Sequence, residues 1–301
     1  MAILVDAQTR VLVQGITGRE AAGFALESIR YGTQILAGVT PGKGGAEVHG
    51  VPVFDSVAAA MRARPCTASI ICVPAPFVRD AAQEALENGI KLLAVVTERI
   101  PRKDVVAVLE VARERQARVI GPNSLGVISP NRSRLGMCGG AVESIRRAYT
   151  AGSVGVMSRS GGMMTEIASM LTQAGIGQST CVSIGGDPIV GSTFLDLLPL
   201  YEKDPETKAL VLFCEPGGSM EEQLAAHLSA QGSRLRLFAF VAGRFTDRNQ
   251  GVRFGHAGAI VEGSQGSPSS KIETLRSAGV IVADKLSQIP ELVRSALAAT
   301  N

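Results

Sequence analysis

The sequence has three histidines and five cysteines among its 301 residues, and it has no long apolar run. No apolar stretch reaches the roughly 18 residues that a membrane-spanning helix needs. The opening segment MAILVDAQTR lacks the charged and then apolar pattern of a secretory signal. The cysteines form no CxxC pair and are odd in number, which favours reduced and mostly buried thiols. We therefore expect a soluble protein of a bacterial cytoplasm or, as the alternative, of an organelle matrix.

Charge of one sign is not concentrated anywhere in the chain. The formal net charge is +3, and the basic residues are spread out without a block. This distribution gives little support for nucleic acid binding, but it leaves small anions as possible partners. A hydrophobic fraction of 46% with 19% charged residues is typical of a folded globular protein. The length allows one large or two medium domains, each with its own core.

Short apolar runs rich in β-branched residues alternate with helical stretches along the chain. The runs are continuous, which indicates strands covered on both faces, as in a parallel sheet. The pattern restarts near residue 153, after a stretch at 130–152 with few sheet signals. The sequence therefore predicts two doubly wound α/β domains. Helices are expected at 18–30, 77–88, 102–115, 162–175, 193–202, 219–230, 268–278 and 287–299.

The first glycine-rich turn, VLVQGITGREAAGF, does not have the GxGxxG spacing of dinucleotide-binding folds. Its glycines still let the backbone approach a phosphate at a helix N-terminus, although a βα turn without a ligand explains them too. The second strand, in ILAGVTPGKGG, lacks the acidic residue that holds the ribose of NAD and is followed by Lys43 instead. Lys43 favours a phosphorylated ribose, as in CoA or NADP; the alternative is a solvent-exposed loop lysine.

Two further turns combine small and polar residues. In SRSGGMMTE, the hydroxyls of Ser158 and Ser160 and the bare amides of Gly161 and Gly162 converge at a helix start, where an anion could bind. A simple N-cap at Ser160 accounts for part of this pattern. In IGGDPIVGST, Asp187 follows a strand at the edge where such sheets bind ligands, but the segment could be a turn alone.

One histidine lies in a run of small residues, GHAGA. The glycine and alanine around His256 clear space for a nucleophilic imidazole that must accept a bulky group. Glu215, at the end of LVLFCEPGG, could fix the ring tautomer. The alternative is a structural or exposed histidine, and this is the interpretation that we give to His49 and His227.

These stretches together resemble the α subunit of succinyl-CoA synthetase and related NDP-forming acid–CoA ligases, over essentially the whole chain. The matching segments, in the family's order, are VQGITGRE, GVTPGKGG, VPAPF, GPNSLGVISP, SRSGG, GQSTCVSIGGDPIVGSTF, EKDPETKA and GHAGAI. The resemblance implies a Rossmann-like CoA-binding domain at 1–130. It also implies a flavodoxin-like ligase domain at 131–301 that carries a phosphohistidine loop.

The resemblance also implies a set of site residues. His256 would be the phosphorylated residue, and Glu215 would be its carboxylate partner. The acid or phosphate would contact Asn123, Ser160, Gly161, Gly162 and Thr165. CoA would contact Thr17, Gly18, Arg19, Glu20, Lys43, Val96, Thr97 and Glu98.

Departures from the family pattern surround the expected acid site. Ser124 and Leu125 replace the usual Cys-Pro, Gly162 replaces a threonine, and Thr165 replaces a tyrosine. The segment GMCGGAVESIRRAYTAGS is longer than usual and resembles the corresponding part of ATP-citrate lyase. We expect an enlarged pocket, so the acid could be succinate, or instead citrate, malate or another substituted acid.

The chain lacks the GxxxxGK[ST] motif of a phosphate-binding loop. The resemblance therefore implies that ATP or GTP with Mg²⁺ is bound mainly by a β subunit of the ATP-grasp type, in a heterodimer or heterotetramer. No metal ligands, nucleic acid or membrane are expected for this chain. Three other functions stay open: an NADP-dependent oxidoreductase, a CoA-binding module without catalysis, and a serine hydrolase using Ser160, Asp187 and His256. The hydrolase would lack the GxSxG turn.

Overall fold

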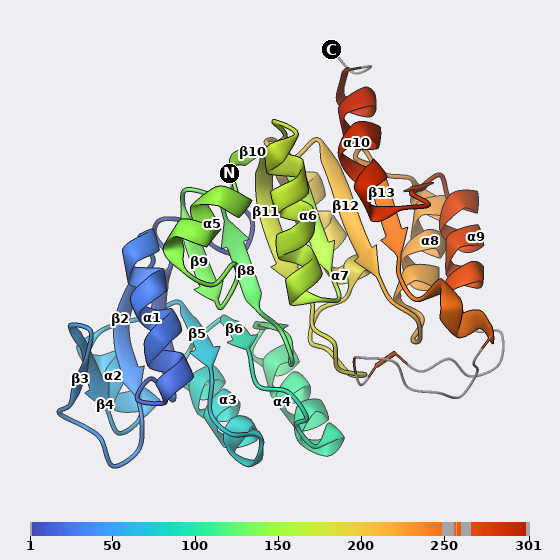
Figure 1. Ribbon diagram of the computed structural model, residues 1–301. Coiled ribbons are helices and arrows are strands. Elements are labelled where there is room, and N and C mark those ends of the chain that lie inside the picture. Colours follow the sequence, from blue (N-terminus) through green and yellow to red (C-terminus); the bar gives the residue numbers. More distant parts are fainter. Residues whose placement is uncertain (1, 249–255, 257, 260–265, 299–301) are drawn as a thin grey trace.

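The computed structural model describes residues 2–248, 256, 258–259 and 266–298, and it has two sheets flanked by helices (Figure 1). The predicted α/β class with two doubly wound sheets is confirmed. Within the described residues, no helix is both long and apolar enough to span a bilayer.

The first sheet has seven strands in the order β3-β4-β2-β1-β5-β6-β7, parallel except for the β3–β4 hairpin. The α2, α3 and α4 helices cover one face of this sheet, and α1 packs on the other. The strands are β1 (Arg10–Gln14), β2 (Gln34–Val39), β3 (Glu47–Val48), β4 (Val51–Phe54), β5 (Ala68–Ile71), β6 (Leu92–Val95) and β7 (Arg118–Ile120). The helices are α1 (Arg19–Tyr31), α2 (Val57–Ala63), η1 (Ala75–Phe77), α3 (Val78–Glu87) and α4 (Arg102–Glu114).

The second sheet also has seven strands, in the order β14-β13-β12-β10-β11-β8-β9. Its strands are β8 (Gly126–Ser129), β9 (Ser133–Gly136), β10 (Ala151–Ser158), β11 (Gln178–Ser183), β12 (Ala209–Cys214), β13 (Arg236–Val241) and β14 (Ile281–Val282). The strands from β10 to β14 are parallel, whereas β8 runs antiparallel to β11 and β9 antiparallel to β8.

Helices cover both faces of the second sheet (Figure 1). The helices α5, α6 and α10 pack on one face, and α7, α8 and α9 on the other. One apolar core runs from the α1 face of the first sheet into the α7 face of the second. The helices and turns are α5 (Val142–Ala148), α6 (Gly161–Gln173), α7 (Phe194–Lys203), α8 (Met220–Gln231), η2 (Arg244–Arg248), α9 (Pro268–Ser277), η3 (Leu286–Gln288) and α10 (Ile289–Ala298).

The sequence indicated little strand structure at 130–152, but a strand lies there. The β9 strand lies inside 130–152, and its four residues are all buried because it pairs with β8 and packs under α1. The chain passes from one sheet to the other between β7 and β8, before residue 130. The predicted domain boundary between residues 130 and 131 stays a prediction.

Arg134 joins the β9 strand to α1 across this junction. Its side chain is fully buried, and its guanidinium donates hydrogen bonds to Ser28 Oγ and to the carbonyls of Phe24, Cys138 and Gly140. Because a buried guanidinium needs several acceptors to offset its lost hydration, these four groups and Arg134 depend on one another.

We expect Arg134→Ala to lower the free energy of unfolding by about 3 kcal/mol or more, because it leaves buried acceptors without a donor and opens a cavity. Denaturant unfolding followed by circular dichroism measures this change. The matched control is Arg132→Ala two residues earlier, where a half-exposed guanidinium pairs with Glu206 at 2.8 Å. That variant should lose at most about 1 kcal/mol. Equal losses in both variants would contradict the role assigned to Arg134.

Candidate functional site

A cavity of about 1110 Å³ lies where the carboxyl ends of β1, β2, β5 and β6 meet the start of α1. This is the edge at which open α/β sheets bind ligands. The predicted CoA-binding residues that line it are Thr17, Gly18, Arg19, Glu20, Val96, Thr97 and Glu98. Lys43 does not line it: the residue lies exposed in the following loop, where its N–H donates to Thr40 O.

The start of α1 gives the cavity an anion-binding end. Gly18 is the N-cap and offers no side-chain acceptor, so the first amide groups of the helix remain available to a ligand. Gly15 has a φ of 84°, and a Cβ there would meet Cys72 O at 3.0 Å, so glycine allows this close turn. Arg19 adds a positive charge to the same wall.

Part of the cavity lining is apolar, next to the acidic Asp80 and Glu84 of α3. Phe77 is 60% exposed and lies beside Pro74 and Val73, and Met137 reaches the cavity from the end of β9 in the second sheet. Sequence reasoning quoted VPAPF but did not single out Phe77. It also missed Met137, for which the sequence carries no signal.

A second group of polar residues gathers at the carboxyl edge of the second sheet. Arg159 and Ser160 follow β10, Asp187 follows β11 and Glu215 follows β12. Because these strands are parallel neighbours, the residues after them meet at one edge. His256 lies against this edge with its side chain 30% exposed.

The predicted pair of His256 and Glu215 forms. His256 Nδ1 lies 2.7 Å from Glu215 Oε2, and the Glu215 side chain is 14% exposed. With the Nδ1 proton donated to this carboxylate, the lone pair of the neutral imidazole is on Nε2. The ring therefore presents Nε2 as its nucleophilic atom.

Neighbouring charges set the proton affinity of His256. The hydrogen bond to Glu215 raises the pKa of His256 above its usual value, against the lowering effect of burial. Arg159 also lowers this pKa and Asp187 raises it. The net result is a raised pKa.

Two glycines let the His256 loop lie close to the sheet edge. A Cβ on Gly186 would come within 2.5 Å of the His256 ring, and a Cβ on Gly258 would come within 2.7 Å of an Arg159 nitrogen. The Gly258 N–H donates to Gly186 O at 3.1 Å. The glycine and alanine directly beside His256, at 255 and 257, lie outside the described residues.

Ser160 is the N-cap residue of α6. Ser160 Oγ accepts the Met163 N–H at 3.5 Å, and Ser158 Oγ bonds to both backbone groups of Ser160. Gly161 packs against Leu125, where a Cβ would come within 2.2 Å. Gly162, in contrast, is exposed and would place its Cβ in open space.

The two remaining predicted residues are engaged within the protein. Asn123 lines the large cavity and donates to Asp187 Oδ1 at 3.1 Å. Thr165 Oγ1 lies 2.9 Å from the hydroxyl of the buried Tyr149 and also bonds to Gly161 O. Sequence reasoning missed Tyr149, although it is one of three tyrosines and lies in the segment of unusual length.

The Ser160, Asp187 and His256 arrangement of a serine hydrolase does not form. His256 bonds to Glu215, Asp187 bonds to Asn123 and Ser160 caps its own helix. Sequence reasoning also missed Arg159, whose only signal was a charged residue inside SRSGG.

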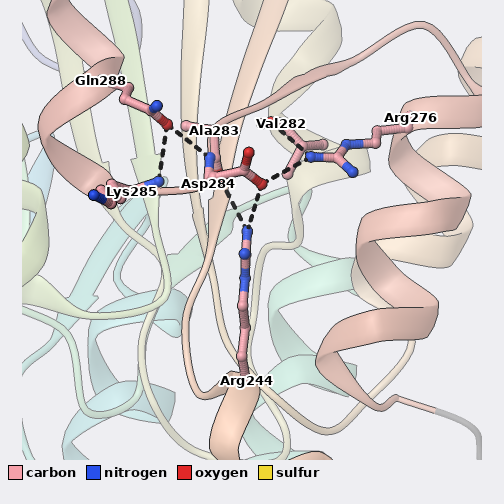
Figure 2. Close-up of polar contacts among 7 residues, drawn as sticks. All are labelled: Arg244, Arg276, Val282, Ala283, Asp284, Lys285 and Gln288. Atoms are coloured by element: carbon pink, nitrogen blue, oxygen red, sulfur yellow. Dashed lines mark hydrogen bonds and ion pairs between the residues drawn. The ribbon is translucent and has the colours of Figure 1, made fainter.

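Ionic contacts hold Arg244 of the η2 turn, which precedes His256 in the chain (Figure 2). Arg244 in η2 and Arg276 in α9 donate to the same oxygen of Asp284, at 3.3 and 3.1 Å. The two guanidiniums lower the pKa of Asp284. Gln288 accepts the backbone N–H groups of Asp284 and Lys285. The arginines and Asp284 also line a second cavity of about 470 Å³.

After His256, the chain at Gly266 is hydrogen-bonded to the loop that follows Glu215. Gly266 O accepts the Gly217 N–H at 2.8 Å. Lys271 is fully buried and donates to Gly218 O, Glu221 and Glu222. The carboxylates raise the pKa of Lys271 in spite of its burial, so this cation stays charged.

Comparisons with known proteins support the two regions separately. Residues 6–99 match the family described as CoA binding domain, and residues 157–281 match the family described as CoA-ligase. The α subunit 1 of the ADP-forming succinate–CoA ligase of Archaeoglobus fulgidus is 46% identical over 99% of this chain and 99% of its own. A subunit of the ADP-forming sulfoacetate–CoA ligase of an Acholeplasma species is 42% identical over 97% of each chain.

A solved structure has the same architecture over nearly the whole chain. The ATP citrate lyase of Methanosaeta concilii, in complex with (3S)-citryl-CoA, aligns with a TM-score of 0.90 and 26% identity over 97% of this chain. This chain spans 50% of the length of that protein.

We expect Glu215→Gln to lower the pKa of His256, because the Glu215 hydrogen bond is the largest cause that raises it. An NMR titration of the imidazole measures this directly. Since the neutral ring then persists to lower pH, any reaction at Nε2 that survives should lose its rate at a lower pH than in the wild type. Glu114→Gln, on the exposed face of α4, should leave the titration unchanged. An unaltered His256 pKa in Glu215→Gln would refute the assignment.

Proposed function

The chain belongs to the CoA-ligase family that includes the α subunits of ADP-forming succinate–CoA ligases, and we propose that His256 carries its phosphoryl group. The chain is thus an acid–CoA ligase subunit. The observation that carries the proposal is the Nδ1 hydrogen bond to Glu215, which leaves Nε2 as the nucleophile.

The reaction proceeds through two covalent intermediates. His256 Nε2 attacks the terminal phosphorus of ATP or GTP, and the nucleoside diphosphate leaves. A carboxylate oxygen of the acid then attacks this phosphorus, so the P–N bond breaks and an acyl phosphate forms. Finally the CoA thiol loses its proton and its sulfur attacks the acyl carbon, which releases inorganic phosphate and leaves the acyl-CoA thioester.

The large cavity is the proposed CoA site, in a domain of residues 1–130, and His256 belongs to a ligase domain of residues 131–301. The amides at the start of α1 and Arg19 suit the phosphates, and the apolar wall of Phe77, Pro74 and Val73 suits the less polar parts of CoA. Lys43 reaches CoA if its loop closes over Pro41, which does line the cavity.

A partner subunit completes the enzyme. The relatives are named as α subunits or subunits of ligases, which supports a second chain. We propose a β subunit of the ATP-grasp type that binds ATP or GTP and Mg²⁺, in a heterodimer or heterotetramer in the cytoplasm.

The acid is a small carboxylate, with succinate as the first candidate because of the named relatives. The exposed Gly162 favours a second candidate, a bulkier acid such as citrate or malate. A Cβ at 162 would meet no described atom within 4 Å apart from the chain neighbours and the helix's own backbone, so the α6 start leaves room beside the Ser160 turn. The relatives that act on sulfoacetate and citrate lend this candidate support.

We expect His256→Asn, assembled with its partner, to lose acyl-CoA formation by at least about 1000-fold, because no other group accepts the phosphoryl group. CoA affinity should change little, since the cavity is lined by other residues. Label from γ-³²P nucleotide, acid-labile and base-stable, should appear on the wild type and on His227→Asn but not on His256→Asn. Label retained by His256→Asn would exclude His256 as the carrier.

We expect Gly162→Thr to favour succinate over citrate or malate by about tenfold in kcat/KM, roughly 1.4 kcal/mol, because the added side chain fills space at the α6 start. Gly23→Thr, at an equally open position in α1, controls for the cost of threonine in a helix. Steady-state kinetics with the three acids measures the ratio. A preference that is the same in wild type and Gly162→Thr would place the acid elsewhere.

A further inference from the structure

Asn123 lies where the chain crosses from the first sheet to the second. It lines the large cavity, and its N–H donates to Thr97 O at 3.0 Å in the wall of that cavity. Its own carbonyl accepts the Gly186 N–H at 3.1 Å. The backbone of this one residue therefore joins the CoA cavity to the loop that supports His256.

The Asn123 side chain makes a second link to the same loop. Its Nδ2 donates to Asp187 Oδ1 at 3.1 Å, and Asp187 is only 5% exposed. The backbone carbonyl of Asp187 accepts Arg159 Nη2 at 3.3 Å. A carboxylate so buried needs donors to offset its lost hydration, so the amide stabilises both the charge and the position of Asp187.

The supported loop is in direct contact with the His256 segment. Gly186 O accepts the Gly258 N–H, and the His256 ring lies against Gly186 so closely that no side chain fits between them. The charge of Asp187 also acts on the imidazole, whose pKa it raises. A shift of the 186–187 loop would therefore move the ring and alter its charge surroundings together.

Asparagine at 123 suits both the local backbone conformation and the need for a side-chain donor to Asp187. The backbone there has a φ of 54°, a left-handed conformation that asparagine tolerates better than most residues. Its carboxamide supplies the donor. Glycine would accept the same backbone but would lack the donor, and aspartate would place a second carboxylate beside Asp187.

We propose that Asn123 is a positioning residue of the ligase reaction: from the wall of the CoA cavity it holds Gly186 and Asp187 in place beneath His256. This rests on the proposed function of His256. Since Asn123 acts through the 186–187 loop, its loss should slow the transfer steps at His256 more than it weakens CoA binding.

The first test is Asn123→Gly in the complex with the partner subunit. We expect kcat to fall by about 10- to 100-fold, as for a displaced reacting group, with the Kd of CoA within about threefold of the wild type. The matched control is Asn131→Gly, because Asn131 is exposed in a loop and has a similar φ of 61°. That variant should keep the wild-type kcat. A normal kcat in Asn123→Gly, or a loss confined to CoA affinity, would overturn the proposal.

The second test is Asn123→Asp, which replaces the donor to Asp187 by a second carboxylate. Because two adjacent carboxylates repel, the 186–187 loop should be displaced at least as far as in Asn123→Gly. We expect kcat to fall at least as much as in Asn123→Gly. A normal kcat in Asn123→Asp would contradict the proposal.

Failure of the underlying function is visible separately. Single-turnover labelling with γ-³²P nucleotide reports whether wild-type His256 is phosphorylated at all. No label on the wild type would contradict the proposed function. A labelled wild type together with a normal rate in Asn123→Gly would contradict the positioning role alone.

Discussion

The hydrogen bond between His256 and Glu215 determines which imidazole nitrogen can react, and much of the second sheet serves to form it. Glu215 is positioned by β12, a fully buried strand between β10 and β13. The loop after β12 is held by Gly266 and by the buried Lys271, and the His256 loop is held by Gly186. The Glu215 carboxylate, whose side chain is 14% exposed, stays beside the ring because these contacts leave its loop little freedom.

The charges around His256 oppose one another. Glu215 and Asp187 favour the protonated ring, whereas Arg159 and burial favour the neutral one. Arg159 is 7% exposed and, within the described ranges, forms no ion pair with a carboxylate. The proposed role of His256, a neutral nucleophile that then holds an anionic phosphoryl group, requires such a balance, because a purely acidic environment would keep the ring protonated.

The sequence predicted the fold well because buried parallel strands and amphipathic helices have distinct patterns. Helices such as α6 and α9 begin within a residue of their expected positions. The β9 strand was not predicted, because SRLG is short and its burial comes from β8 and α1 rather than from its own hydrophobicity. Charged or small residues in such a strand carry no local signal.

The contact between His256 and Glu215 was predicted because the proposed chemistry requires these two residue types together. Orientation was not predictable in the same way. The family pattern predicts where Thr165 lies along the chain. It does not predict that the Thr165 hydroxyl contacts Tyr149. Arg159 and Met137 were missed because their positions depend on which segments meet in space. Asp187 was placed at the correct edge of the sheet, but its contact with Asn123 was not predicted.

The segment from β9 to Tyr149 connects the parts of the molecule that would define the acid site. Arg134 binds it to α1, Met137 lines the large cavity, and Tyr149 contacts Thr165 on α6. A tyrosine at 165 would enter space beside the buried Tyr149, so that position cannot change independently of the segment. Gly162 has no such neighbour. If the proposed acid site lies at the start of α6, its size can therefore change at 162 alone, whereas a larger side chain at 165 requires the segment to repack against α6.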